Sequence, residues 1–299
     1  RNLVTCVLLL VIAHGDLWAQ SRIIDTHIHL YDPTRPGGIP WPRPGSELYR
    51  PYLPPDFAAV AGPAGVTAAV VVEASPLTED NQWMLDLMAD EPLLVALVGR
   101  LYLGSDDFAD NLARYATNPR FVGIRHRVRE TDLDDESIMA SLHSMVECNI
   151  ALDMMIRGMT LADASVVAAA FPDLRIIINH VAGRPIDGTG PDSTWVQEIE
   201  DLARHPNVYM KISGLYQNTR LEPAVTDVSY YAPALDVVWN AFGEDRLIYG
   251  SNWPVSTMYG KYGPNVDIAR SYLASKGEVA LDKVMWRNAV KAYDLELED

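Results

Sequence analysis

The feature that most constrains the fold is a series of eight short apolar runs, rich in β-branched residues, that begins after residue 21. After the first run they recur about every thirty residues, and the segments between them place apolar residues three and four positions apart. This pattern predicts strands that alternate with helices. The eight runs are residues 22–30, 65–74, 93–102, 121–128, 149–156, 174–183, 207–216 and 245–254.

Near-continuous Val, Ile and Leu runs are typical of strands covered on both faces, as in a parallel sheet. Eight strand–helix units within residues 21–299 fit a single-domain α/β fold, the (β/α)8 TIM barrel, with a doubly wound open sheet as the alternative. One connection breaks the rhythm, because a long Pro-rich segment follows the first run. Its aromatic residues, Trp41 and Tyr49 among them, predict an ordered loop over the mouth of the barrel.

Residues 1–20 have the composition of a secretory signal peptide, with Arg1, an apolar run over 3–13 and the small residue Ala19 near the end. We therefore expect export to the periplasm or the medium, with a cytoplasmic location as the alternative. The apolar run is too short for a membrane anchor, so none is expected after processing. The formal net charge of −16 disfavours nucleic acid as a partner.

Histidines end two of the predicted strands, where a TIM barrel carries its active site. His27 and His29 end the first run two residues apart, so alternation along the strand places both imidazoles on one side, together with Asp25. His180 ends the sixth run. Three neutral imidazoles can bind one divalent metal such as zinc and leave a position for water. Histidines with purely structural roles are the alternative.

Charged side chains also occur at strand ends. Arg125 and His126 end the fourth run, Lys211 lies in the seventh and Glu73 ends the second. A charge within an apolar strand is costly unless it is paired or lines a polar cavity. We expect Arg125 and Lys211 to face an anionic or carbonyl-bearing substrate. A structural ion pair of Lys211 with Glu73 or Asp25 is the alternative.

The order of the strand-end motifs resembles the amidohydrolase-2 family, and in particular its lactonase branch. The likeness extends from about residue 23 to residue 295. It implies a TIM barrel that opens a small-molecule lactone with water, either with one divalent metal or without any. The motifs that carry the resemblance are IIDTHIHLYDP, VVVEAS, FVGIRH, INHVAGRP, VYMKISGLY, YGSNWPV and MWRNAVKAYDL.

On this resemblance, His27 and His29 match the first-strand His-x-His of the family and His180 matches its sixth-strand His, so all three are implied metal ligands. Asn252 stands where the family has an Asp that serves as general base. The implied catalytic residues are His180, Asn252, Lys211 and Arg125. The residues expected to bind substrate are Trp41, Tyr49, Glu73, Arg125, His126, Arg184, Lys211 and Trp253.

The amide of Asn252 cannot remove a proton from water, so the water must be activated in another way. A metal-bound water, His180 as base, or a carboxylate from Glu73 or Asp25 could each do so. A barrel that binds a lactone or sugar acid without turnover is an alternative function. A decarboxylase is a weaker one, because the fifth run lacks the His that the related decarboxylases have there. The basic strand ends predict a sugar-acid or carboxylated lactone.

Overall fold

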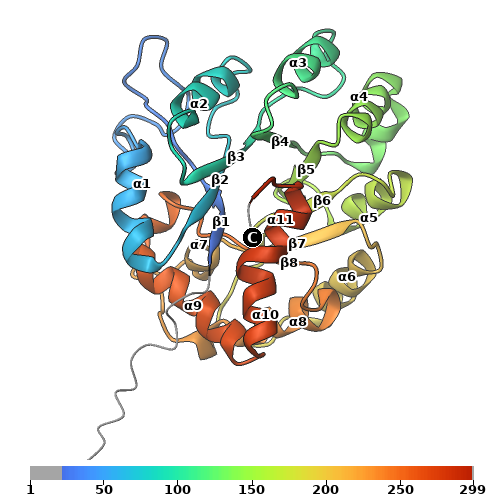
Figure 1. Cartoon of the computed structure of the whole chain (residues 1–299). Coiled ribbons are helices and arrows are strands. Elements are labelled where there is room, and N and C mark those ends of the chain that lie inside the picture. Colours follow the sequence, from blue (N-terminus) through green and yellow to red (C-terminus); the bar gives the residue numbers. More distant parts are fainter. Residues whose placement is uncertain (1–21, 298–299) are drawn as a thin grey trace, which may run out of the picture.

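The computed structural model describes residues 22–297, so the predicted signal peptide over 1–20 lies outside them and export stays a prediction. Eight parallel strands form one sheet in the order β1 to β8, with helices along its outer side (Figure 1). Each strand lies within one of the eight predicted runs. The strands are β1 (Ile24–Ile28), β2 (Ala68–Val72), β3 (Leu94–Gly99), β4 (Phe121–Arg125), β5 (Ala151–Met154), β6 (Ile176–Ile178), β7 (Val208–Ile212) and β8 (Leu247–Tyr249).

The helices alternate with the strands as the apolar spacing predicts. Two short helical elements also position the site, namely η3 (His180–Gly183) after β6 and the π-helical turn η6 (Lys283–Arg287) near the carboxyl end of the described chain. The α-helices are α1 (Pro54–Ala61), α2 (Asp80–Met88), α3 (Phe108–Tyr115), α4 (Glu136–Glu147), α5 (Leu161–Ala170), α6 (Ser193–Ala203), α7 (Leu215–Thr219), α8 (Ala232–Phe242), α9 (Tyr262–Ala274), α10 (Glu278–Asp282) and α11 (Asn288–Tyr293).

The sheet closes through the segment that follows β8. The backbone N–H of Asn252 donates to the carbonyl oxygen of His27 at 2.8 Å, and the N–H of His29 donates to the carbonyl oxygen of Trp253 at 2.7 Å. These bonds join the last strand to the first. The predicted (β/α)8 barrel is therefore confirmed, and the doubly wound open sheet is wrong.

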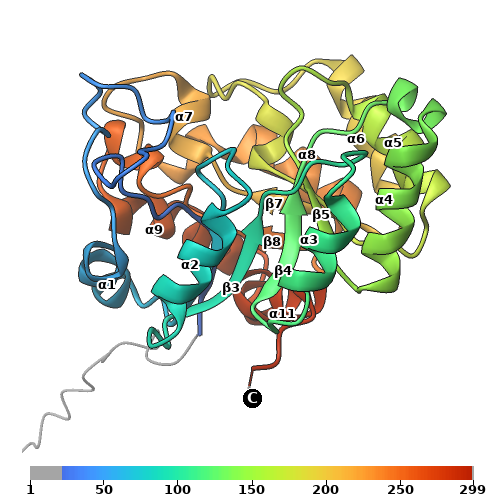
Figure 2. The same ribbon diagram turned by 90° about the horizontal axis from the view of Figure 1, so that it is seen from above.

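Apolar side chains pack on both sides of the strands, which explains the near-continuous Val and Ile runs. Inside the barrel, Ile24, Val70 and Ile248 form a cluster with Trp286 and Tyr293 from the last helical segment. In Figure 2, α11 lies at one end of the barrel, while α7 and the loop after β1 lie at the opposite end. The chain therefore closes the amino-terminal end of its own barrel and leaves the other end for the site.

The Pro-rich loop after β1 is ordered, as predicted. Tyr31 and Tyr52 exchange backbone hydrogen bonds of 2.9 and 2.8 Å across its base. The ring of Trp41 packs edge-on against Tyr31, with 5.2 Å between centroids. These contacts hold the loop over the carboxyl ends of the strands.

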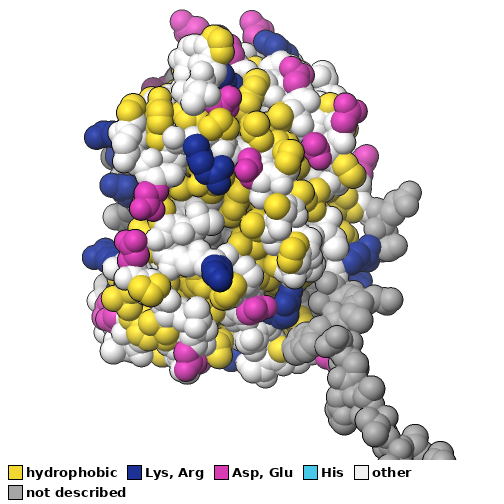
Figure 3. All heavy atoms as spheres, turned by 90° about the vertical axis from the view of Figure 1, so that its left-hand side faces the viewer, with side chains coloured by type: hydrophobic (Ala, Val, Ile, Leu, Met, Phe, Trp, Pro, Cys, Tyr) yellow, Lys and Arg dark blue, Asp and Glu magenta, His cyan; other side chains and the backbone are white. Residues whose placement is uncertain are grey.

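One face of the outer surface carries charged and hydrophobic side chains side by side (Figure 3). Figure 3 shows the face that carries α1, where acidic, basic and hydrophobic side chains are interspersed. Among residues 22–297, no helix is long and apolar enough to cross a membrane.

The closure of the barrel depends on close approach at Gly250. A Cβ at this position would lie 2.8 Å from the Cβ of His27 and 3.1 Å from its backbone nitrogen. We expect Gly250→Ala to lower the free energy of unfolding by about 1–3 kcal/mol, because the added methyl overpacks the β1–β8 contact. Gly62→Ala is the matched control, since a Cβ there meets nothing within 4 Å. Urea denaturation measures both, and equal stability of G250A and the wild type would contradict the close approach.

Candidate active site

A cavity of about 840 Å³ lies at the carboxyl ends of the strands. Its lining includes His29 after β1, Arg125 at the end of β4, His180 after β6 and Asn252 after β8. Trp41 from the Pro-rich loop forms part of its wall. Five residues predicted from strand ends and from the loop therefore meet in one cavity.

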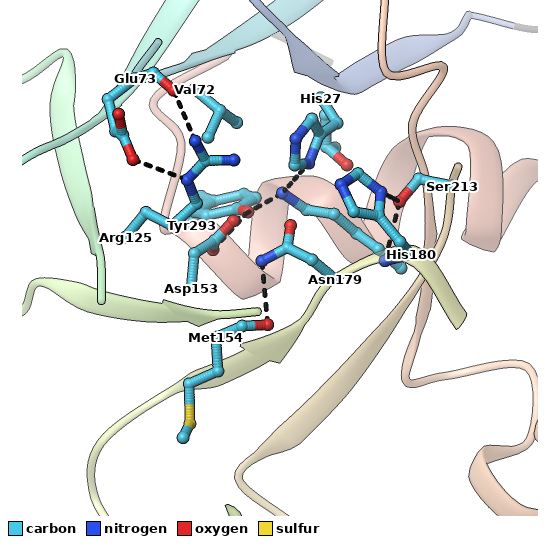
Figure 4. Close-up of polar contacts among 12 residues, drawn as sticks. His27, Val72, Glu73, Arg125, Asp153, Met154, Asn179, His180, Ser213 and Tyr293 are labelled. Atoms are coloured by element: carbon cyan, nitrogen blue, oxygen red, sulfur yellow. Dashed lines mark hydrogen bonds and ion pairs between the residues drawn. The ribbon is translucent and has the colours of Figure 1, made fainter. Parts of the chain in front are cut away.

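A fully buried ion pair lies beneath this cavity. Lys211 of β7 places its Nζ 2.7 Å from Oδ2 of Asp153 in β5, and neither side chain is exposed. The Tyr293 hydroxyl of α11 donates to Oδ1 of the same carboxylate at 2.7 Å. On its other side, Nζ of Lys211 lies 3.4 Å from Nδ1 of His27 (Figure 4). The pair thus connects β1, β5, β7 and the helix that closes the barrel.

This arrangement bears on two expectations for Lys211. The side chain, expected to face substrate, is fully buried and does not line the cavity. It does form a structural ion pair, but its partner is Asp153 rather than Glu73 or Asp25. Sequence reasoning missed Asp153, although an acidic residue within the apolar fifth run was a signal for it.

Asp25 does not share the side of the two histidines, contrary to the prediction from strand alternation. The pairing of β1 with β2 shifts register between Asp25 and Ile28, and such a bulge interrupts the alternation. The carboxylate accepts hydrogen bonds from the N–H of Ser251 (2.8 Å) and the N–H of His27 (3.1 Å), and from the hydroxyl of Tyr262 (2.9 Å). Burial raises the pKa of Asp25. This residue ties β1 to the segment after β8 and does not face the cavity.

Arg125 is held in place by Glu73. Its Nε donates to Oε1 of Glu73 at 2.8 Å, and its Nη2 donates to the carbonyl oxygen of Glu73 at 2.8 Å. The remaining nitrogen, Nη1, is left for a ligand in the cavity. Glu73 is paired with Arg125 and does not line this cavity, so we do not assign it as the base for the cavity water. Glu73 and His126, both predicted to bind substrate, line a smaller adjoining pocket of about 210 Å³.

His29 is a neutral imidazole with a fixed orientation. Its Nδ1 lies 2.9 Å from the carbonyl oxygen of Val72, which can only accept, so Nδ1 carries the proton. Burial lowers the pKa of His29 to about 3, so the other nitrogen keeps its lone pair. That nitrogen, Nε2, lies 3.1 Å from the amide Oδ1 position of Asn252. Since a lone pair requires a donor, the amide presents its NH2 group to His29.

His180 stands at the start of a left-handed turn. The backbone φ angles of its first three residues are 59°, 50° and 52°, which non-glycine residues adopt rarely. The Nδ1 of His180 lies 2.9 Å from Oγ of Ser213, and Asn218 donates to its carbonyl oxygen at 3.0 Å. Glycine at position 214 allows His180 to lie this close to the β7 connection, because a Cβ on residue 214 would lie only 2.9 Å from the Cβ of His180. Burial, then Arg125 and Lys211, lower the pKa of His180 well below 6.5.

Besides Glu73, His126 and Lys211, three more side chains predicted to bind substrate do not line the cavity. Tyr49 is exposed on the loop, with 37% of its surface accessible. Arg184 forms an ion pair of 2.6 Å with Asp192. Trp253 is buried and packs edge-on against Tyr52, with 5.3 Å between ring centroids. The segments that carry these residues were predicted correctly, but the local backbone directs the side chains away from the cavity.

Two arginines of the cavity were missed from the sequence. Arg157, in the loop after β5, and Arg220, directly after α7, both line the cavity. Neither lies at a strand end, so an inspection restricted to strand ends does not reach them.

A closed eight-stranded barrel with a polar cavity at the carboxyl ends of its strands has the design of a TIM-barrel enzyme. Residues 24–295 match the family model described as amidohydrolase. The chain therefore belongs to the amidohydrolase family, as the order of its motifs predicted.

Several known proteins resemble the chain over most of its length. L-fucono-1,5-lactonase of Burkholderia ambifaria is 32% identical over 80% of this chain and 83% of its own length. 4-Sulfomuconolactone hydrolase of Rhizobium radiobacter is 26% identical over 78% of this chain and 75% of its own. A crystal structure of an amidohydrolase from Burkholderia multivorans with bound zinc has a TM-score of 0.80 at 23% identity, over 91% of this chain and 99% of that one.

The contribution of the buried Lys211–Asp153 ion pair to stability can be measured. Asp153→Asn removes the charge that faces Lys211, and we expect the free energy of unfolding to fall by about 3–5 kcal/mol because the ammonium stays buried without a counter-charge. Asp201→Asn is the matched control. It breaks an ion pair with Arg204 whose side chains are 74% and 47% exposed, so its effect should stay within about 1 kcal/mol. Equal effects of the two substitutions in urea denaturation would contradict the structural role of the pair.

Proposed function

We propose that the protein is a hydrolase that opens a lactone by attack of water on the ring carbonyl. Family membership supports this proposal, as do the two relatives named for lactone hydrolysis. The observation that carries it is the pairing, within one cavity, of a neutral imidazole at His180 with an oriented guanidinium at Arg125. The first can take a proton from water, and the second can stabilise a carbonyl oxygen that becomes negative.

The three histidine rings lie together, with 4.3 Å between the centroids of His27 and His180 and 5.0 Å between those of His27 and His29, but we propose that they do not act as a set of metal ligands. Lys211 is an ammonium paired with Asp153 and has only donors, so from its contact with Nδ1 of His27 we assign the ring proton of His27 to Nε2, a buried atom that has no hydrogen-bond partner among the described residues. The lone pair that a metal would need at Nε2 is then absent. Within residues 22–297, no three His, Cys, Asp or Glu side chains form a group that could hold a metal. We therefore propose a reaction that uses protein side chains alone.

His180 is the proposed base. We assign the ring proton of His180 to Nδ1, which then donates to Oγ of Ser213 2.9 Å away, so that Nε2 keeps its lone pair for a water molecule in the cavity. As water attacks, Nε2 takes one of its protons and an oxygen–carbon bond forms at the carbonyl. When the ring C–O bond breaks, the imidazolium returns that proton to the departing alkoxide. The net change is one lactone plus one water to one hydroxy acid.

Arg125 is the proposed oxyanion stabiliser. The two hydrogen bonds to Glu73 fix the plane of its guanidinium before substrate arrives. Stabilisation by such a preorganised donor needs no rearrangement during the reaction. Arg125 also lowers the pKa of His180, and this repulsion is relieved as the carbonyl oxygen gains negative charge and the imidazole gains its proton. The Asn252 amide is placed to hydrogen-bond water or substrate beside them.

One experiment can test both that the reaction is a hydrolysis and that it needs no metal. We expect the purified protein to open six-membered lactones after exhaustive chelation at the same rate as before, with one oxygen from ¹⁸O-labelled water in the new carboxylate. Loss of activity on chelation with recovery on zinc addition would contradict the metal-free proposal. Release of CO2 without label uptake would favour a decarboxylase, and binding without turnover would favour the inactive barrel.

His180→Gln tests the base. We expect kcat to fall by about 10²–10⁴-fold, the usual contribution of general-base catalysis. In the wild type, the acid limb of kcat/KM should lie below pH 6.5, because a base of lowered pKa stays deprotonated to lower pH and loses activity only as the pH falls through that value. His205→Gln, a change outside the cavity, is the control. Near-normal turnover by H180Q would contradict the assignment.

A further inference from the structure

The charges that line the cavity differ from those of the chain as a whole. The sequence holds 40 acidic residues against 24 Lys and Arg. The described side chains that line the cavity nevertheless include Arg125, Arg157 and Arg220 and no Asp or Glu. A cavity lined by one sign of charge concentrates ligands of the opposite sign.

The three arginines are not equivalent. Arg125 is bound twice by Glu73 and is already assigned to the carbonyl oxygen. Arg157 and Arg220, by contrast, have no side-chain hydrogen bond or ion pair within the described part of the chain. Other arginines, such as Arg184 with Asp192, do have a carboxylate partner. An unpaired guanidinium beside a cavity is suited to a carboxylate from a ligand, which it can bind through two parallel hydrogen bonds.

The two unpaired arginines flank the proposed base. Arg157 follows β5 and Arg220 follows β7, while His180 follows β6, and these three strands are neighbours in the sheet. The backbone of Arg220 is held by its N–H, which donates to the carbonyl oxygen of Gln217 at 3.2 Å. The two arginines therefore come from the connections after β5 and β7, the strands on either side of β6, and both line the same cavity.

We propose that Arg157 and Arg220 form a subsite for a carboxylate carried on the lactone ring, so that the substrates are anionic lactones rather than neutral sugar lactones. This inference rests on the proposed lactone hydrolysis. A neutral lactone develops negative charge at its carbonyl group, and Arg125 serves that group. Two further guanidiniums match a second negative group on the same molecule. The Asn252 amide fits this subsite, because a carboxylate at the same place would repel such a substrate.

The test compares two lactones that differ only in the ring carboxylate, δ-valerolactone and tetrahydropyran-2-one-6-carboxylate. We expect the wild type to prefer the carboxylated lactone by at least about tenfold in kcat/KM. Arg157→Gln and Arg220→Gln should each raise KM for it by about 10–100-fold, the usual effect of losing a hydrogen bond between charged groups. The same substitutions should lower kcat/KM for δ-valerolactone much less, so that the preference for the carboxylated lactone falls by about tenfold or more. Arg204→Gln, on an arginine outside the cavity that is 74% exposed, is the matched control.

A second measurement separates failure of the subsite from failure of the proposed function. Calorimetry follows the binding of tetrahydropyran-2-carboxylate, which cannot be hydrolysed, to the wild type and to both variants. One outcome is that neither lactone is opened, while the wild type binds this acid and the two variants do not. That result would support the subsite and contradict the hydrolase proposal. If both lactones are opened equally and the variants behave as wild type, the subsite is overturned while the hydrolase proposal stands.

Discussion

The site depends on one ion pair, between Lys211 and Asp153, at the centre of the barrel. Removing two charges from water costs several kcal/mol for each ion, and this is offset only when the geometry is good and the remaining polar atoms are bonded. Both conditions are met by the 2.7 Å contact and by the Tyr293 hydroxyl, which donates to the second carboxylate oxygen. The pair divides the barrel interior into an apolar layer below and a polar layer above.

The chemistry of the upper layer follows from this buried cation. The ammonium of Lys211 points a donor at Nδ1 of His27, and from this contact we assign the ring proton of His27 to Nε2. Burial and the charges of Arg125 and Lys211 also lower the pKa of His180 and keep it neutral. Lys211 thus supplies positive charge beneath the cavity without lining it, and we propose that it positions the histidines rather than reacting itself.

The fold could be predicted from the sequence because strands buried on both faces require near-continuous apolar runs, and each of the eight runs contains one strand. The prediction was wrong where a local irregularity breaks the periodic rule. The register shift after Asp25 turns its carboxylate toward Tyr262, so the expected alternation with the histidines is lost. The closure of the barrel by α11 was not predicted either. It depends on contacts between residues far apart in the chain, which periodicity does not report.

The site could be predicted only in part, for a similar reason. Arg125 and His180 stand at strand ends, whose location in a barrel is fixed by topology. Arg157 and Arg220 reach the cavity from loops, whose course depends on their own turns and contacts. Trp253 lies in a recognised motif, yet its side chain packs under the loop against Tyr52. A motif therefore specifies where the backbone passes, while the direction of each side chain depends on local φ and register.

Asn252 shows how backbone and electrostatics act together at one position. Its φ of 60° lies in the left-handed region, which Asn and Asp adopt more readily than most residues, so the backbone accepts either. The neighbouring ring of His29 favours Asn over Asp at position 252. With its proton committed to Val72, the ring turns a lone pair toward residue 252, and an amide can donate to that lone pair where a carboxylate cannot. A carboxylate would favour a protonated His29 and would add negative charge to a cavity lined by arginines. The amide is therefore consistent with a neutral His29, a base at His180 and an anionic ligand.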